Sequence, residues 1–155
     1  MQVLFQYNWQ VRNNWLKWCE QLSEEELLVE RKGGVGNILH TLLHIIDVEY
    51  SWIRGLKGES DYEVDFSEYK TVESVKSLSD SLQIEIKQYL ESWSNEMEYE
   101  NVKVSWNEEE YMKGEILRHI IAHEIHHIGQ LSVWSRELGL RPVSANLIGR
   151  GLMNK

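Results

Sequence analysis

The sequence predicts an all-α protein, a four-helix bundle with a crossover connection. Apolar residues recur at the three- and four-residue spacing of helices along four long stretches of the 155-residue chain. Helix breakers are scarce, with ten glycines and a single proline, Pro142. Hydrophobic residues make up 42% of the chain, which is enough for a packed core, so we expect residues 1–155 to form a single domain.

The first half of the chain predicts two of the long helices. The first helix, from about residue 3 to 22, has its apolar stripe at Leu4, Val11, Trp15, Trp18 and Leu22. Ser23, followed by three glutamates, has the pattern of a cap and first turn, which predicts a short helix there. The glycine-rich segment 32–36 then breaks the chain before the second long helix, which we expect to end near Gly55.

The second half predicts two more long helices with a non-helical insertion between them. An acidic, tyrosine-bearing loop through about Lys70 is long enough to cross over the bundle. The third helix has its apolar stripe at Val75, Leu78, Leu82, Ile86, Tyr89 and Trp93. Between Tyr99 and Lys113, apolar and polar residues alternate, which permits a short extended segment. The fourth helix carries the stripe that begins at Ile116, and Gly139 and Pro142 mark its end.

Charge and hydropathy disfavour two classes of partner, nucleic acids and membranes. The formal net charge is −9, and the segment from Glu59 to Glu110 holds 15 acidic against four basic residues, which disfavours nucleic-acid binding. No stretch approaches the roughly 20 apolar residues of a membrane span. The first residues lack the features of a signal peptide, and the lone Cys19 suits a reducing compartment, so we expect a cytoplasmic protein. Cys19 follows an apolar helical pattern, which favours core packing over catalysis.

The fourth helix carries a histidine pair with metal-ligand spacing. His123 and His127 lie four residues apart, so their side chains share one face of the helix. That spacing allows two imidazoles to bind one metal ion. The pair interrupts an apolar stripe, where an unsatisfied buried polar group costs on the order of 1–3 kcal/mol. A shared metal would remove this cost for both, and the alternative is a pair of hydrogen-bonded core histidines.

The same segment also matches the H-E-x-x-H motif of zinc proteases. In that interpretation Glu124, between His123 and His127, would be the general base. Such proteases take their third ligand from downstream. After His127 this chain has no histidine or aspartate, and its last glutamate, Glu137, lies only ten residues on. A third ligand is therefore expected upstream, where the second long helix offers His40 and His44. Spacing alone does not choose between these two.

Two motifs together resemble the DinB-like superfamily. They are His44-x-x-Asp47-x-Glu49 on the second long helix and His123-x-x-x-His127-x-Gly129-Gln130 on the fourth, and the tail from Leu138 to Ile148 is also similar. The resemblance implies a four-helix bundle, a homodimer and a divalent metal held by three histidines. Matched to this chain, those ligands are His44, His123 and His127. Nickel or zinc is the first expectation for the metal, with manganese or iron as alternatives.

The resemblance also implies an activity. Relatives include enzymes that use a low-molecular-weight thiol in S-transfer or isomerisation, so the leading expectation is a metal-dependent enzyme with a thiol cosubstrate and a small-molecule substrate. Glu124 or Asp47 would assist proton transfer. The alternatives are a non-catalytic metal-binding protein of the stress response and a metal-dependent hydrolase.

The other positions near the motifs carry weaker expectations. His119 and His40 are each either a neighbour of a ligand or an alternative ligand. His126 points about 100° away from the next residue, which predicts a solvent or interface position. Gln130 is placed to hydrogen-bond near the site or to pack between helices. Many relatives carry an arginine where this chain has Ile128, to handle an anionic substrate or to form a structural ion pair. Its loss here weakens inferences about the substrate.

Overall fold

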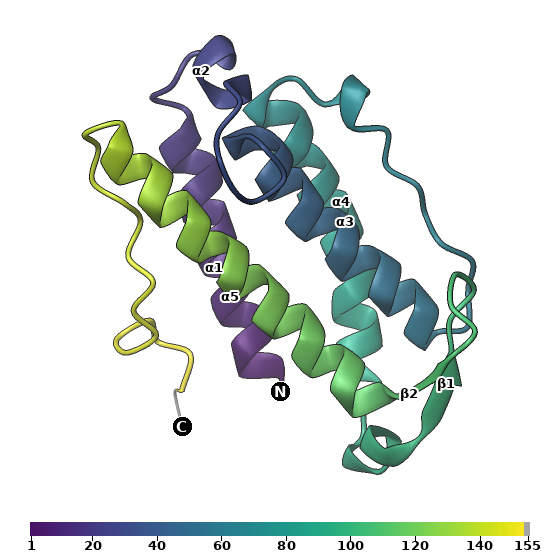
Figure 1. Cartoon of the computed structure of the whole chain (residues 1–155). Helices are drawn as coiled ribbons and strands as arrows, with labels where there is room; N and C mark the ends of the chain where they lie inside the picture. The colour runs from purple at the N-terminus through teal and green to yellow at the C-terminus, as the bar shows by residue number, and fades with distance from the viewer. Residues whose placement is uncertain (154–155) are drawn as a thin grey trace.

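The computed structural model describes residues 1–153 and consists of four long helices packed side by side (Figure 1). They are α1 (Gln2–Cys19), α3 (Ile38–Leu56), α4 (Val72–Glu91) and α5 (Lys113–Glu137). Around the bundle, α1 and α3 each pack against both α4 and α5. The all-α, four-helix prediction is therefore confirmed. None of the helices in residues 1–153 is long and apolar enough to cross a membrane.

The connection between α3 and α4 is the predicted crossover. These two helices run in the same direction, so the chain has to return along the bundle between them (Figure 1). Residues 57–71 make this return on the outside of the bundle and contain one short 3-10 helix, η1 (Phe66–Glu68). A crossover of this kind requires a long loop, and the acidic segment supplies it.

Side-chain caps begin the helices that follow loops. The side chain of Ser23 accepts a hydrogen bond from the Glu26 amide at the start of the short α2 (Glu24–Leu28), as predicted. Asn37 caps α3 and Thr71 caps α4 in the same way. The helix α1 ends at Cys19, three residues before the predicted end. Gly139 follows the end of α5 with φ of +71°, a conformation that favours glycine.

The extended segment predicted between α4 and α5 is a short hairpin at one end of the bundle (Figure 1). Its strands, β1 (Asn101–Lys103) and β2 (Glu110–Met112), pair antiparallel after a 3-10 helix, η2 (Asn95–Tyr99). The hairpin loop approaches α3 closely at Gly55. A Cβ atom added at Gly55 would lie 2.7 Å from Val104 and 2.9 Å from Trp106. The absence of a side chain at Gly55 therefore allows the hairpin loop to pack against α3.

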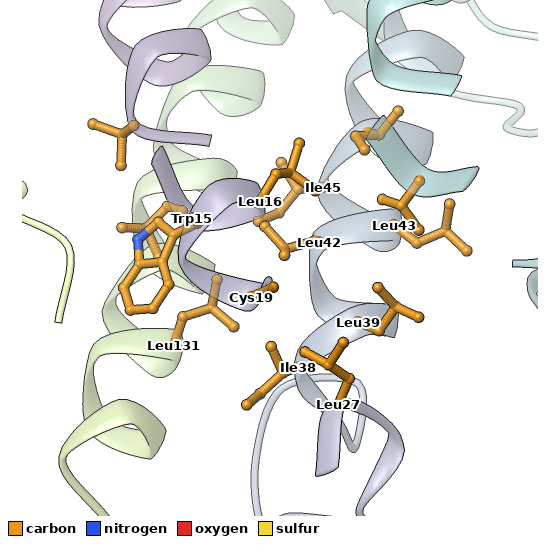
Figure 2. Close-up of a cluster of buried hydrophobic side chains, with 14 of the residues drawn as sticks. Trp15, Leu16, Cys19, Leu27, Ile38, Leu39, Leu42, Leu43, Ile45 and Leu131 are labelled. Carbon is orange, nitrogen blue, oxygen red and sulfur yellow. The ribbon is translucent and has the colours of Figure 1, made fainter. Parts of the chain in front are cut away.

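The apolar core consists of two clusters, one toward each end of the bundle. The first holds the end of α1, α2 and the start of α3, and Figure 2 shows Trp15, Leu16 and Leu42 among its side chains. Cys19 belongs to this cluster and is fully buried, which confirms its packing role, and burial raises its pKa to about 12. The second cluster lies toward the hairpin and includes Phe5. Each long helix contributes residues to both clusters.

A layer of buried polar residues lies between the two apolar clusters. Its centre is Arg12 of α1, which is 1% exposed and forms ion pairs with Glu49 of α3 at 2.7 Å and Glu124 of α5 at 2.6 Å. Arg12 also lies 3.5 Å from the hydroxyl of Ser79 on α4. Trp9 donates a hydrogen bond to Glu49 at 2.8 Å. One guanidinium thus joins all four long helices.

We predict that replacing Arg12 with leucine destabilises the protein by about 3–5 kcal/mol, because two buried carboxylates then lose their cation. Urea unfolding at pH 7 measures this loss. The loss should shrink toward pH 5, since burial raises the pKa of Glu124 and protonation removes the uncompensated charge. The matched control is the triple variant Arg12→Leu, Glu49→Leu, Glu124→Leu. It removes the three charges together and should be more stable than Arg12→Leu alone. Equal stability of the wild type and Arg12→Leu would contradict the prediction.

Candidate metal centre

Three imidazoles from two helices converge beside the polar layer. His44 comes from α3, and His123 and His127 come from α5. The Nε2 atom of His123 lies 3.1 Å from Nε2 of His44 and 3.1 Å from Nε2 of His127. One ring nitrogen from each residue lies within 4.8 Å of the others. Two nitrogens that bind zinc tetrahedrally at 2.0–2.1 Å lie roughly 3.4 Å apart, so this cluster fits a single divalent ion.

The environment keeps the three imidazoles neutral. Burial lowers the pKa of His44, and the neighbouring His127 lowers it further. Burial also lowers the pKa of His123 to about 3, with added contributions from His127 and His44. The pKa of His127 is lowered by burial, although its hydrogen bond with Gln130 opposes the shift. Neutral imidazole is the form that binds metal, so the cluster is ready to act as a ligand set at neutral pH.

Gln130 fixes the tautomer of one candidate ligand. Its side-chain oxygen lies 2.7 Å from Nδ1 of His127, so this nitrogen is the one that donates a proton. The Nε2 atom of the same ring then carries the lone pair that points toward the other two histidines. The amide nitrogen of Gln130 in turn faces His126 at 3.2 Å. A second partner that orients a metal-binding imidazole in this way is a common feature of metal sites.

Asp47 is the acidic candidate on the histidine face of α3. It follows His44 by three residues, so the two side chains leave the same face of the helix. Asp47 is half-buried, and burial raises its pKa to about 6, with a smaller contribution from the negative charge of Asp61. A carboxyl group with this pKa changes its protonation state close to neutral pH, which suits proton transfer.

Glu124, the other acidic candidate, is held by the polar layer. Its two carboxylate oxygens accept hydrogen bonds from Nε and Nη2 of Arg12 at 2.9 and 2.6 Å. The residue is 1% exposed, so the structure does not bring it to the solvent side where a substrate could approach. The metal cluster takes its third histidine from α3, upstream of the H-E-x-x-H segment, which differs from the ligand arrangement of the protease interpretation.

The three remaining histidines lie around the cluster without joining it. Nδ1 of His40 lies 3.2 Å from the side-chain nitrogen of Asn37, and its ring centre lies 5.5 Å from that of Phe66. His126 is exposed, in agreement with the predicted position. His119 is exposed and its ring centre lies 5.8 Å from that of His123. His119 therefore lies one helical turn from the cluster, toward the hairpin.

Sequence reasoning missed Arg12, the residue that holds the two helices bearing the cluster. A signal was present, because Arg12 lies in the predicted first helix between the apolar positions Val11 and Trp15. A single arginine beside an apolar stripe of a bundle helix indicates a buried ion pair when acidic residues occupy comparable positions on other helices. Glu49 and Glu124 occupy such positions.

Comparison with known proteins gives one consistent family. The chain is 58% identical over 153 residues to the uncharacterized protein YizA of Bacillus subtilis (strain 168), covering 98% of this chain and 96% of that protein. The fold is similar to that of a DinB-like protein from Bacillus cereus ATCC 10987, with a TM-score of 0.68 and 17% identity over 91% of this chain and 94% of the other. A DinB-like protein of Bacillus subtilis, YjoA, gives a TM-score of 0.63 and 18% identity over 93% and 96%. Residues 1–151 match the model of the DinB family, and the chain therefore belongs to that family.

Proposed function

We propose that this protein is a metal-dependent enzyme that transfers a low-molecular-weight thiol to a small-molecule substrate. The reaction would take place at a divalent metal ion held by His44, His123 and His127. The observation that carries the proposal is the convergence of three neutral imidazole nitrogens within 4.8 Å of one another. Three protein ligands leave coordination positions free, which is typical of catalytic and not of structural sites. A divalent ion in such a site supplies Lewis acidity that favours a thiolate at neutral pH. The family resemblance is the reason for choosing a thiol.

The chain's own residues have separate roles in this proposal. The three histidines hold the ion without adding charge, and Gln130 keeps His127 in the tautomer that can bind. Asp47 accepts the thiol proton, since its pKa of about 6 leaves it mostly ionised at pH 7. The thiolate sulfur then forms a bond to an electrophilic carbon of the substrate, whose leaving group departs with the bonding electrons. We assign proton transfer to Asp47 and not to Glu124, because Arg12 occupies both oxygens of Glu124.

Metal content tests the proposed site directly. Elemental analysis of untagged protein should find about one transition-metal ion per chain, with nickel or zinc expected before manganese or iron. His44→Ala and His123→Ala should each lose most of this metal, because two imidazoles remain. His126→Ala is the matched control and should keep it, since His126 lies outside the cluster. Wild-type protein that takes up no metal even on reconstitution would refute the site.

Turnover with a thiol and an electrophile tests the proposed reaction. Metal-loaded protein incubated with a small thiol and the electrophile monochlorobimane should form the fluorescent conjugate faster than the metal-free protein does. The His123→Ala variant should fall to the metal-free rate. Stoichiometric metal without any turnover would instead favour a non-catalytic metal-binding role. Light scattering on the same samples checks the expected homodimer.

The pH dependence of the rate tests the role of Asp47. The conjugation rate should rise as the pH increases through about 6, because Asp47 has to be ionised to accept a proton. Asp47→Asn should lower the rate on the order of 100-fold and remove this dependence. Asp61→Asn should shift the dependence to lower pH, because a negative charge that raises the pKa of Asp47 is removed. Metal content measured at each pH shows whether metal loss causes the change, and an unaltered profile in Asp47→Asn would exclude its role.

A further inference from the structure

An aromatic hollow adjoins the histidine cluster at the hairpin end of α5. It has a volume of about 400 Å³, which lies within the range of roughly 300–1,000 Å³ for small-molecule sites. Trp52 of α3, Trp106 and Tyr111 of the hairpin segment and His119 of α5 line it. Because His119 also lies 5.8 Å from His123 between ring centres, the hollow begins one helical turn from the candidate metal centre.

The rings of the hollow are arranged around Trp52. The ring centres of Trp106, His119 and Tyr111 lie 5.3, 5.6 and 6.0 Å from that of Trp52. Their planes stand at 72°, 72° and 85° to the Trp52 plane. The hollow therefore has aromatic surfaces in several directions, as in the aromatic cages that bind quaternary ammonium groups.

Neighbouring residues hold two of these rings in place. The hydroxyl of Tyr111 accepts a hydrogen bond from the side chain of Asn107 at 2.5 Å and donates one to Glu109 at 3.1 Å. Trp106 is positioned by the close approach of the hairpin loop to Gly55, because a Cβ at Gly55 would lie 2.9 Å from the Trp106 ring. Trp106 nevertheless remains 39% exposed, so its ring is accessible from the solvent.

The charges around the hollow favour a cation. Glu115 lines the hollow, and no lysine or arginine does. Among the described residues, Glu115 forms no ion pair, whereas nearby cations are already paired, Lys113 with Glu100 and Arg118 with Glu98. Aromatic faces carry a negative quadrupole that attracts a cation and repels an anion. Rings and carboxylate therefore select the same sign of ligand charge.

From this arrangement we propose that the hollow binds the positively charged head of a small organic cation, a quaternary or tertiary ammonium group. The hollow is the subsite that holds the substrate beside the histidine cluster, and in this respect the inference rests on the proposed function. The ammonium head lies among Trp52, Trp106 and Tyr111 next to Glu115, and the rest of the molecule extends along α5 toward His123.

The test compares choline with 3,3-dimethylbutanol, a neutral molecule of the same shape, by ligand-observed NMR with EDTA present. Choline should bind at least about tenfold more tightly, because only the charged head is attracted by the rings and the carboxylate. Trp106→Leu and Gly55→Ala should each weaken choline binding about tenfold or more. The second variant keeps every ring and only displaces the hairpin loop.

Two control variants separate these effects from general damage. Tyr99→Leu removes an exposed aromatic ring outside the hollow, and Gly129→Ala adds a Cβ to a helix where nothing lies within 4 Å. Both should bind choline as the wild type does, and urea midpoints confirm that all four variants are folded.

Equal binding of the neutral molecule, or no choline binding in the wild type, would overturn the proposal. Because EDTA removes metal, binding of choline by a protein that fails the metal test supports the hollow alone. Metal uptake without choline binding refutes the hollow and leaves the metal centre.

Discussion

The buried guanidinium of Arg12 is the interaction on which the arrangement of the four helices depends. A buried ion pair adds little stability over well-packed apolar residues, but the loss of one partner costs about 3–5 kcal/mol. Any shift of α3 or α5 along the bundle would separate Glu49 or Glu124 from Arg12 and incur that cost. The apolar clusters on either side tolerate such shifts more easily, because contacts between apolar side chains are not directional. The polar layer therefore fixes the register of the helices.

Fixing this register also places the histidines. His123 directly precedes Glu124, and His44 lies five residues before Glu49 on the same helix. A helix positioned by its glutamate therefore positions its histidine as well. The layer contains two carboxylates for one guanidinium, and a divalent ion on three neutral imidazoles has no ligand charge to balance it. This excess of carboxylate lies on the same two helices as the cluster, and it would favour a divalent ion held there.

Local features of the sequence predict the helices well, whereas tertiary contacts decide the details of the site. The end of α5 follows from Gly139, whereas α3 continues through Gly55 to Leu56 and is followed by Gly58, whose φ is +74°. The residues alone did not choose between His40 and His44, which share one face of α3. The distinction arises because the ring of His40 lies beside Phe66 of the crossover loop, a contact that only the folded chain creates. The partners of Arg12 depend on distant helices for the same reason.

Several features of the structure bear on the charge of a ligand in the proposed hollow. Ile128, the residue after the last histidine of the cluster, is buried in the apolar core, so no cation stands at that position. The hollow that adjoins the histidine cluster presents aromatic rings and Glu115. An anion approaching this end of the bundle also meets the acidic loop and hairpin, whereas a cation is attracted by them. The rings, Glu115 and the surrounding acidic segments together support the proposal that the hollow takes a cationic ligand.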